Sequence, residues 1–225
     1  MSGTSIKLGK ERNSTQHTSI KVEGIVLAAG LSTRMSYCKL EAEIEGVPLV
    51  QRVVQAALNS ELDRVVIVSG THDFSCLDTF GRHSNLSRLH MIANLHPERG
   101  MASSMRAGLE AVRQAVAGAM VLLGDQPGIS TAIVNALLEE FRRNPDRIVV
   151  PFIFGRKTTP VIFPASLFPE LANTTGDVGG RGVLARNAER ISGVELGTEY
   201  DDTDVDTPED LDRIRKNFAM KSKVD

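Results

Sequence analysis

Near the amino terminus, a short apolar run leads into a loop that carries two positive side chains. The run at residues 24–28 (GIVLA) continues into residues 27–35 (LAAGLSTRM), which include Arg34, and Lys39 follows. Small residues directly after a buried strand let the backbone approach a ligand closely, and successive backbone N–H groups in such a turn form a cradle for anions. Together with the two cations, this cradle suits a triphosphate. A surface loop with two solvated cations is the alternative, and the segment matches neither the Walker pattern nor GxGxxG.

Acidic residues stand where a divalent cation could be held against phosphate oxygens. Asp125 follows the apolar run at residues 119–123 (AMVLL), at the expected carboxyl end of a strand, and carboxylate oxygens are ligands that Mg²⁺ prefers. Asp204 and Asp206 alternate onto one face of an extended segment near the carboxyl terminus, so either could supply a second metal contact. The alternatives are a turn or cap role for Asp125 and a solvated acidic loop for the other two.

Two further loops have the composition of ligand-binding segments. Residues 94–104 (NLHPERGMASS) open an expected helix, whose N-terminus is a natural anion site. A helix cap at Ser103 or Ser104 is the alternative there. Residues 176–182 (GDVGGRG) form a glycine-rich loop that contains a cation, Arg181, and a flexible loop without a ligand is the alternative.

These segments require a framework that brings them to one place. Apolar runs bounded by glycine or polar residues predict buried strands, and apolar residues at helical spacing predict helices between them. The strands are expected at residues 24–28, 65–68, 89–93, 119–123, 148–153 and 161–163. The helices are expected at residues 49–58, along a face formed by Met105, Leu109, Val112 and Val116, along Ile133, Leu137, Leu138 and Phe141 after a cap at Ser130, and from near Pro208 past Ile214.

This alternation of strands and helices predicts a parallel sheet that is covered on both faces. In such sheets, ligands bind at the carboxyl ends of the strands. The loops after Ala28, Ala93, Leu123 and Phe163 are therefore expected to carry the chemistry.

Composition argues against several other classes of protein. The 225 residues include 26 Lys and Arg against 28 Asp and Glu, and a net charge of −2 gives no general affinity for nucleic acid or an acidic membrane. Cys38 and Cys76 form no CxxC pair and the histidines lack metal-binding spacing, so neither a disulfide framework nor a zinc site is expected. The sequence contains no apolar run of about 18 residues, as a membrane span would need.

Five motifs in their order along the chain resemble one known family. They are residues 27–35 with Lys39, residues 94–104, residues 124–127 (GDQP), residues 176–177 and residues 204–210 (DVDTPED). Together they resemble the MobA-like NTP transferases, and within these the molybdenum cofactor cytidylyltransferase branch. The match runs over roughly residues 22–217.

The resemblance implies a Rossmann-like three-layer α/β/α nucleotidyltransferase fold with a mostly parallel sheet. It also implies a Mg²⁺-dependent transfer of CMP from CTP to the molybdopterin form of the molybdenum cofactor, with release of pyrophosphate. Carried over by position, the catalytic residues would be Arg34, Lys39 and Asp125, and the metal ligands Asp125 and Asp206, with Asp204 in reserve. Acceptor-binding residues would be Gly176, Asp177 and Arg181, and nucleotide-binding residues Leu27, Ala28, Ala29, Gly30, Arg34, Lys39, Asn94, Gly100, Ser103, Ser104 and Asp125.

Two departures from the family pattern leave other activities open. Ser36 stands where the family usually has glycine, and residues 158–160 (TTP) stand where it often has Gly-His-Pro. The second departure concerns the acceptor more than the nucleotide. Alternatives are therefore a GTP-dependent molybdenum cofactor guanylyltransferase, a sugar-phosphate nucleotidyltransferase, or, in another class, a non-catalytic cofactor carrier or chaperone.

The expected organisation is one nucleotidyltransferase domain at residues 22–218, between a disordered leader at residues 1–21 and a tail at residues 219–225. The leader is rich in Ser, Thr, Lys and Asn and lacks the apolar segment of a secretory signal. The cytoplasm is therefore the expected location. Expected partners are CTP or another NTP, the molybdopterin-type acceptor and the molybdoenzyme that receives the product, with no nucleic acid and no membrane.

Overall fold

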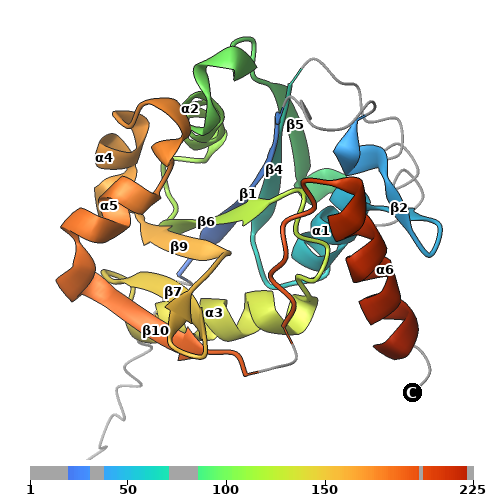
Figure 1. Cartoon of the computed structure of the whole chain (residues 1–225). Helices are drawn as coiled ribbons and strands as arrows, with labels where there is room; N and C mark the ends of the chain where they lie inside the picture. The colour runs from blue at the N-terminus through green and yellow to red at the C-terminus, as the bar shows by residue number, and fades with distance from the viewer. Residues whose placement is uncertain (1–19, 31–37, 71–85, 198–199, 222–225) are drawn as a thin grey trace, which may run out of the picture.

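An eight-stranded sheet with helices on both faces forms the centre of the molecule (Figure 1). The structure is a computed structural model that describes residues 20–30, 38–70, 86–197 and 200–221. Neighbouring strands follow the order β10-β7-β9-β6-β1-β4-β5, and β8 pairs with β7. The strands are β1 (Val22–Ala28), β4 (Arg64–Ser69), β5 (Leu89–Ala93), β6 (Gly118–Leu123), β7 (Ile148–Ile153), β8 (Arg156–Lys157), β9 (Val161–Pro164) and β10 (Ile191–Glu195). The predicted three-layer α/β fold with a mostly parallel sheet is confirmed.

Helices and one small hairpin complete the architecture. The hairpin consists of β2 (Glu43–Ile44) and β3 (Val47–Pro48). The α-helices are α1 (Leu49–Leu58), α2 (Met101–Ala111), α3 (Thr131–Arg143), α4 (Phe168–Ala172), α5 (Arg181–Arg186) and α6 (Pro208–Lys221). Among the described residues, no helix has the length and apolar character needed to cross a membrane.

The alternation of side chains along the strands builds two separate cores. In β1, Val22 and Val26 belong to the core beneath α1 and α3, whereas Ile25 belongs to the core beneath α2 and α5. This follows from the two-residue period of a strand, which sends successive side chains to opposite faces of the sheet. Both faces are apolar because helices cover both.

β9 runs against the parallel strands, as the short β8 also does, and its direction corrects an expectation from the sequence. β9 pairs antiparallel with β6 and with β7, so its carboxyl end lies beside the amino end of β6, where Pro164 pairs with Gly118. The residues directly after Phe163 therefore lie at the end of the sheet opposite to the carboxyl ends of the parallel strands, and the prediction of their position is wrong. The segment before Val161 lies at the expected edge instead.

The helices follow the predicted apolar faces closely, with one exception. α1 has the predicted bounds, and Ser130 caps α3 by accepting a hydrogen bond from the Ile133 N–H at 3.3 Å. α2 ends at Ala111, so Val112 and Val116 are buried as predicted but are not helical, because the chain becomes extended at Val112.

α6 packs on the hairpin and the start of α1 rather than on the sheet. Its side chains Leu211 and Ile214 form a third core with Ile44, Leu49 and Val205, and Figure 1 shows α6 beside α1 and β2. The helix continues to Lys221, so residues 219–221 of the predicted tail are helical. Residues 1–19 of the predicted leader lie outside the described residues.

Candidate active site

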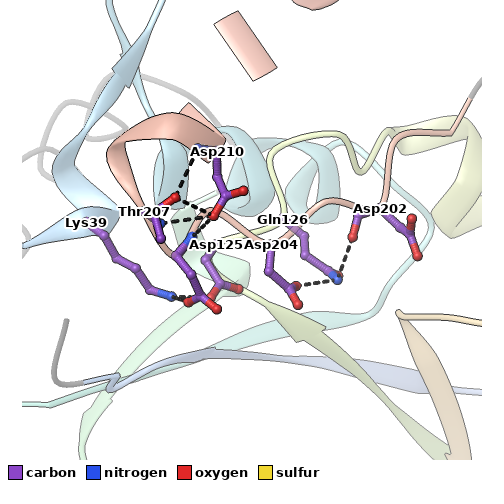
Figure 2. A network of polar contacts seen from close by, with 8 residues as sticks. Lys39, Asp125, Gln126, Asp202, Asp204, Thr207 and Asp210 are labelled. Carbon is purple, nitrogen blue, oxygen red and sulfur yellow. Dashed lines mark hydrogen bonds and ion pairs between the residues drawn. The ribbon is translucent and has the colours of Figure 1, made fainter. Parts of the chain in front are cut away.

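Lys39 joins two carboxylates at the carboxyl ends of the parallel strands. Its Nζ lies 2.6 Å from Asp125 Oδ2 and 2.7 Å from Asp206 Oδ1, and Figure 2 shows Lys39 and Asp125 facing each other. The side chains are 11 % exposed for Lys39, 20 % for Asp125 and 45 % for Asp206. The fold therefore gathers three residues that are 86 and 167 positions apart in the sequence.

The pKa of Lys39 reflects two opposing effects. Burial lowers the pKa of the ammonium group, but the charges and hydrogen bonds of Asp125 and Asp206 outweigh burial and raise it above its ordinary value. Lys39 is therefore a fixed positive charge at neutral pH. A permanent cation between two acids is suited to neutralising negative groups, and it is not suited to proton transfer.

Asp125 is placed by a close contact between the ends of β6 and β1. Gly124 follows β6 and its N–H donates a 3.0 Å hydrogen bond to the Leu27 carbonyl. A Cβ atom at this glycine would lie 3.1 Å from that carbonyl oxygen and 3.5 Å from Leu40 Cδ2. The carbonyl of Asp125 accepts a 3.1 Å hydrogen bond from the Val205 N–H. This bond ties the acidic segment, residues 201–206, to the end of β6.

Gln126 organises the acidic segment from the other side (Figure 2). Its Nε2 donates to Asp204 Oδ1 at 2.8 Å and to the Asp202 carbonyl at 3.3 Å, while its Oε1 accepts from Thr159 Oγ1 at 2.5 Å. The side chain is buried, and its amide uses both oxygen and nitrogen. The sequence motif at residues 124–127 contains this residue, yet the pattern alone gave it no role, because its partners lie 33 to 78 positions away.

Asp204 and Asp206 have different partners. Asp206 shares Lys39 with Asp125, whereas Asp204 accepts from Gln126. Burial raises the pKa of Asp204, and the negative charge of Asp125 raises it further, against the hydrogen bond from Gln126. The two acids that spacing alone left equivalent are thus distinguished by what they contact.

A reciprocal cap at the start of α6 fixes the backbone directly after Asp206. The Asp210 N–H donates to Thr207 Oγ1 at 3.2 Å, and Asp210 Oδ2 accepts from the Thr207 N–H at 3.0 Å. Asp210 Oδ2 also accepts from the Asp206 N–H at 3.3 Å. The predicted helix start near Pro208 is confirmed, and this capping arrangement holds the acidic segment against α6.

The segment after β5 forms a compact turn around a buried amide. Asn94 is buried, and its Nδ2 donates to Ser103 Oγ at 2.8 Å and to Ser104 Oγ at 3.0 Å, while its Oδ1 accepts from the His96 N–H at 2.9 Å. Ser103 Oγ in turn donates to the Gly100 carbonyl at 2.8 Å. Four of the predicted nucleotide-binding residues therefore belong to one network that shapes the start of α2.

The N-terminus of α2 meets the predicted acceptor loop. Asp177 Oδ1 accepts a 3.1 Å hydrogen bond from the Met101 N–H, so a carboxylate of the chain itself occupies this helix end. Gly100 has a φ of +81°, and a Cβ atom there would lie 2.4 Å from Asp177 Oδ1 and 2.8 Å from the Gly176 carbonyl carbon. Glycine at position 100 is what allows the two loops to touch.

The remaining predicted residues are placed as follows. Leu27 and Ala28 end β1, Ala29 is buried and Gly30 is exposed after it. Arg34 lies outside the described residues. Arg181 opens α5 on the surface, and its side chain makes no hydrogen bond or ion pair with any residue that the structure describes.

Asp125 and Asp206 are the best-placed groups for a divalent cation. Within the described ranges, no group of three or more His, Cys, Asp or Glu side chains is arranged to hold a metal. Mg²⁺, however, is typically bound by one or two carboxylates together with substrate phosphates and water. Two carboxylates that converge on a single ammonium nitrogen fit that pattern.

Comparison with known proteins identifies the family. Residues 24–191 match the model of the MobA-like NTP transferase domain. The chain belongs to this family. As a MobA-like nucleotidyltransferase, it is 31 % identical over 202 residues to the "Purine catabolism protein PucB" of Bacillus subtilis, a match that covers 87 % of this chain and 97 % of the relative.

Two further MobA-like relatives carry other names. A "Nicotine blue oxidoreductase" of Paenarthrobacter nicotinovorans is 30 % identical over 202 residues, covering 86 % of this chain and 96 % of that protein. A "Probable molybdenum cofactor guanylyltransferase" of Natranaerobius thermophilus is 25 % identical over 134 residues, covering 60 % of this chain and 62 % of that protein.

Solved structures agree with the MobA-like assignment at the level of the fold. A nucleotidyl transferase from Methanothermobacter superposes with a TM-score of 0.71 at 19 % identity, over 89 % of this chain and 99 % of that one. Rv0371c of Mycobacterium tuberculosis, crystallised in complex with manganese, superposes with a TM-score of 0.69 at 22 % identity, over 87 % and 98 % of the two chains.

Proposed function

We propose that this nucleotidyltransferase moves CMP from CTP to the phosphate of a molybdopterin-type molybdenum cofactor and releases pyrophosphate. The observation that carries the proposal is the meeting of Lys39, Asp125 and Asp206 at the carboxyl edge of the sheet, where α/β folds bind their ligands. Cation and carboxylates in one place are what a reaction between two phosphorylated substrates needs.

The chemical step is a displacement at the α-phosphorus of the nucleotide. An acceptor phosphate oxygen forms the new bond to phosphorus, and the bond to the oxygen that bridges to the β-phosphorus breaks. The electron pair of that bond leaves with pyrophosphate. The attacking phosphate is already ionised, so the protein needs no general base, and catalysis rests on positioning and charge neutralisation.

Lys39 and the two carboxylates divide this work. The Lys39 ammonium offsets negative charge on the triphosphate as it shifts toward the leaving group, where a preorganised cation stabilises the transition state. Asp125 and Asp206 would hold a divalent cation, which supplies charge neutralisation at the phosphate oxygens when bound. The manganese complex of Rv0371c supports a divalent metal in this fold, and the choice of Mg²⁺ is a prediction.

The residues that flank this centre complete the proposed site. The loop from Leu27 to Gly30, with Arg34, is assigned to the nucleotide. The turn built on Asn94 is also assigned to the nucleotide. Because the Asn94 amide is hydrogen-bonded inside the protein, this residue would contribute by shaping the turn. Residues 176–177 and Arg181 are assigned to the acceptor.

The choice between CTP and GTP depends on few residues. The alanine pair at residues 28–29, followed by Gly30, resembles the cytidylyl branch, whereas the guanylyl branch tends to read Ala-Gly-Gly. The relative named as a probable molybdenum cofactor guanylyltransferase favours GTP as the second candidate. The cytoplasmic location and the receiving molybdoenzyme stay predictions.

An assay of pyrophosphate release tests the proposal. The purified protein would be mixed with Mg²⁺, a molybdopterin-type cofactor and each of the four common NTPs in turn, and the product identified by mass spectrometry. We expect release with CTP and a cytosine dinucleotide form of the cofactor. A guanine dinucleotide would assign the second candidate, and cofactor binding without pyrophosphate release from any NTP would make the protein a carrier.

A further inference from the structure

An aromatic side chain stands exposed at the tip of the β7–β8 hairpin, in a backbone conformation that disfavours it. Phe154 is 80 % exposed and has a φ of +49°, and Gly155 beside it has a φ of +74°. Ile153 pairs with Arg156, so the two residues form a two-residue turn. Such turns need positive φ at both positions and favour Asn-Gly or Asp-Gly, because a side chain is strained in the left-handed region.

A second hairpin in the same chain shows that the turn does not require an aromatic residue. Between β2 and β3, Glu45 has a φ of +52° and Gly46 a φ of +74°. The backbone of the two tips is therefore alike, and the second tip carries a polar side chain. Neither burial nor turn geometry accounts for phenylalanine at position 154, which points to a role outside folding.

The sheet register relates the positions of Phe154 and Asp125 through β9. Ile162 of β9 pairs with Met120 of β6 and with Val149 of β7. Asp125 and Phe154 each follow five residues later, and both strands run toward the same edge of the sheet. In the strand order only β9 separates β6 from β7, so both residues closely follow strands that finish at the same end of the sheet.

The hairpin is also fastened to the acidic segment. Both terminal nitrogens of Arg156 contact the carboxylate of Asp202, at 2.8 Å and 2.9 Å, and the Thr158 hydroxyl donates to the same carboxylate. The Asp202 carbonyl accepts from Gln126, directly after Asp125. The tip is therefore held at a defined place beside the candidate site.

Strand order decides which substrate meets this tip. The loop assigned to the nucleotide follows β1 on one side of β6, whereas Phe154 follows β7 on the other. In-line displacement brings the acceptor to the side of the α-phosphorus opposite to the leaving pyrophosphate. We infer that Phe154 is an acceptor-recognition residue whose ring stacks on the planar, fused heterocycle of a pterin-type acceptor, an inference that rests on the proposed function.

Phe154→Asn tests this role without damaging the fold. Asparagine suits the left-handed turn, so we expect the melting temperature of the variant to equal or exceed that of the wild type. We expect the KM for the acceptor to rise about tenfold, the scale of one lost aromatic stacking contact, with kcat and the KM for CTP within about twofold of wild type. Phe154→Tyr should retain the wild-type KM for the acceptor.

Glu45→Asn is the matched control, since it makes the same change in the same kind of turn away from the site. Its KM for the acceptor should equal that of wild type. An unchanged acceptor KM in Phe154→Asn would overturn the inference while leaving the proposed function intact. A raised KM for CTP alone would assign the ring to the nucleobase and would also overturn it.

A binding measurement separates this inference from the proposed function. The probe is 6-hydroxymethylpterin phosphate, followed by the anisotropy of its own fluorescence, so no turnover is required. If the wild type transfers no CMP to the cofactor, the proposed function fails, and probe binding alone decides about Phe154. Weaker binding to Phe154→Asn than to the wild type and Glu45→Asn supports the stacking role, and equal binding to all three overturns it.

Discussion

Lys39 neutralises two carboxylates that would otherwise repel each other. A lysine on a solvated loop would matter little, and its removal would change the free energy of unfolding by less than about 0.5 kcal/mol. The observed position changes that expectation, because Asp125 and Asp206 both lie within 2.7 Å of the ammonium nitrogen and Lys39 is 11 % exposed. The same residue is thus expected to matter for turnover and for stability.

Lys39→Ala should lower kcat/KM for CTP by at least about a hundredfold, or roughly 2.7 kcal/mol in the barrier. It should also lower the free energy of unfolding by about 1–3 kcal/mol, since two acids lose their shared partner. Lys39→Arg should restore only part of the activity, because a planar guanidinium does not replace a compact ammonium. Pyrophosphate release and urea unfolding measure both effects, with the exposed Lys216→Ala as control. Near wild-type turnover in Lys39→Ala would contradict the role.

At this scale the sequence identified residue types but not their partners. Lys39, Asp125 and Asp206 were all candidates, and the structure brings them together. Spacing alone did not distinguish Asp206 from Asp204, because both fall on the same face of an extended segment and their partners are far away in sequence, and only the family resemblance put Asp206 first. The link between Gln126 and Thr159 was missed for the same reason.

Whole elements were easier to predict than their directions. The bounds of α1 follow from helical spacing after Pro48, and β7 from a run of six apolar or small residues. The direction of β9 was not predictable, since an apolar run reads the same in a parallel or an antiparallel strand. The contact between Gly100 and Asp177 depends on how two distant loops meet, which spacing does not reveal.

Gly100→Ala should separate the turn that precedes α2 from the loop at residues 176–178. Its φ of +81° and ψ of −176° belong to a region that only glycine enters readily, and the new methyl group would collide with Asp177. We expect a loss of about 2–4 kcal/mol in the free energy of unfolding, from strain and overpacking together. Gly46→Ala is the control, because its φ is also positive but nothing lies within 4 Å. Equal losses in both variants would mean that contact with Asp177 contributes nothing.

The contribution of the contact between α3 and β10 to stability should depend on pH through the carboxylate of Glu140. The Ser192 hydroxyl donates to this carboxylate at 2.5 Å and, with Asn144 and Arg143, holds the pKa of Glu140 below its ordinary value against the effect of burial. Stability from this group is therefore present above the unfolded pKa of about 4.3 and lost as pH falls through the folded pKa. Glu140→Gln should be less stable than wild type near pH 7, and the difference should shrink toward about pH 3 in thermal melts. A difference that stays constant with pH would exclude the charge as its cause.

Across the whole molecule, the carboxyl ends and the amino ends of the parallel strands have different roles. The candidate site lies where the parallel strands end, and the opposite edge holds a buried acid, Glu23, which is 0 % exposed. Arg113 Nε lies 3.4 Å from it and Arg64 Nη1 3.8 Å from it. The second edge is therefore expected to contribute stability without touching substrate.

Glu23→Ala should lower the free energy of unfolding by about 1–3 kcal/mol, because Arg64, which is 14 % exposed, loses its charge partner, whereas Arg113 is 57 % exposed and screened by solvent. The fraction that remains folded should keep the wild-type kcat. Chemical denaturation gives the first quantity, and active-site titration with pyrophosphate release gives the second. Glu61→Ala, which removes an exposed acid paired with Arg142, is the control and should cost less than about 1 kcal/mol. A fall in kcat for the folded Glu23 variant would show that the two edges are coupled.

The pairing of Lys39 with Asp206 has a consequence for the synthesis of the protein on the ribosome. These residues are 167 positions apart, and Asp206 is held in place by α6. During translation at about 5–20 residues per second, Lys39 and Asp125 leave the ribosome several seconds before the segment with Asp206 and α6. A nascent chain therefore carries an incomplete charge cluster throughout that interval. Under the proposed function, we expect translation order to delay catalytic competence until α6 has emerged, so that a chain that stalls earlier is inactive toward nucleotides.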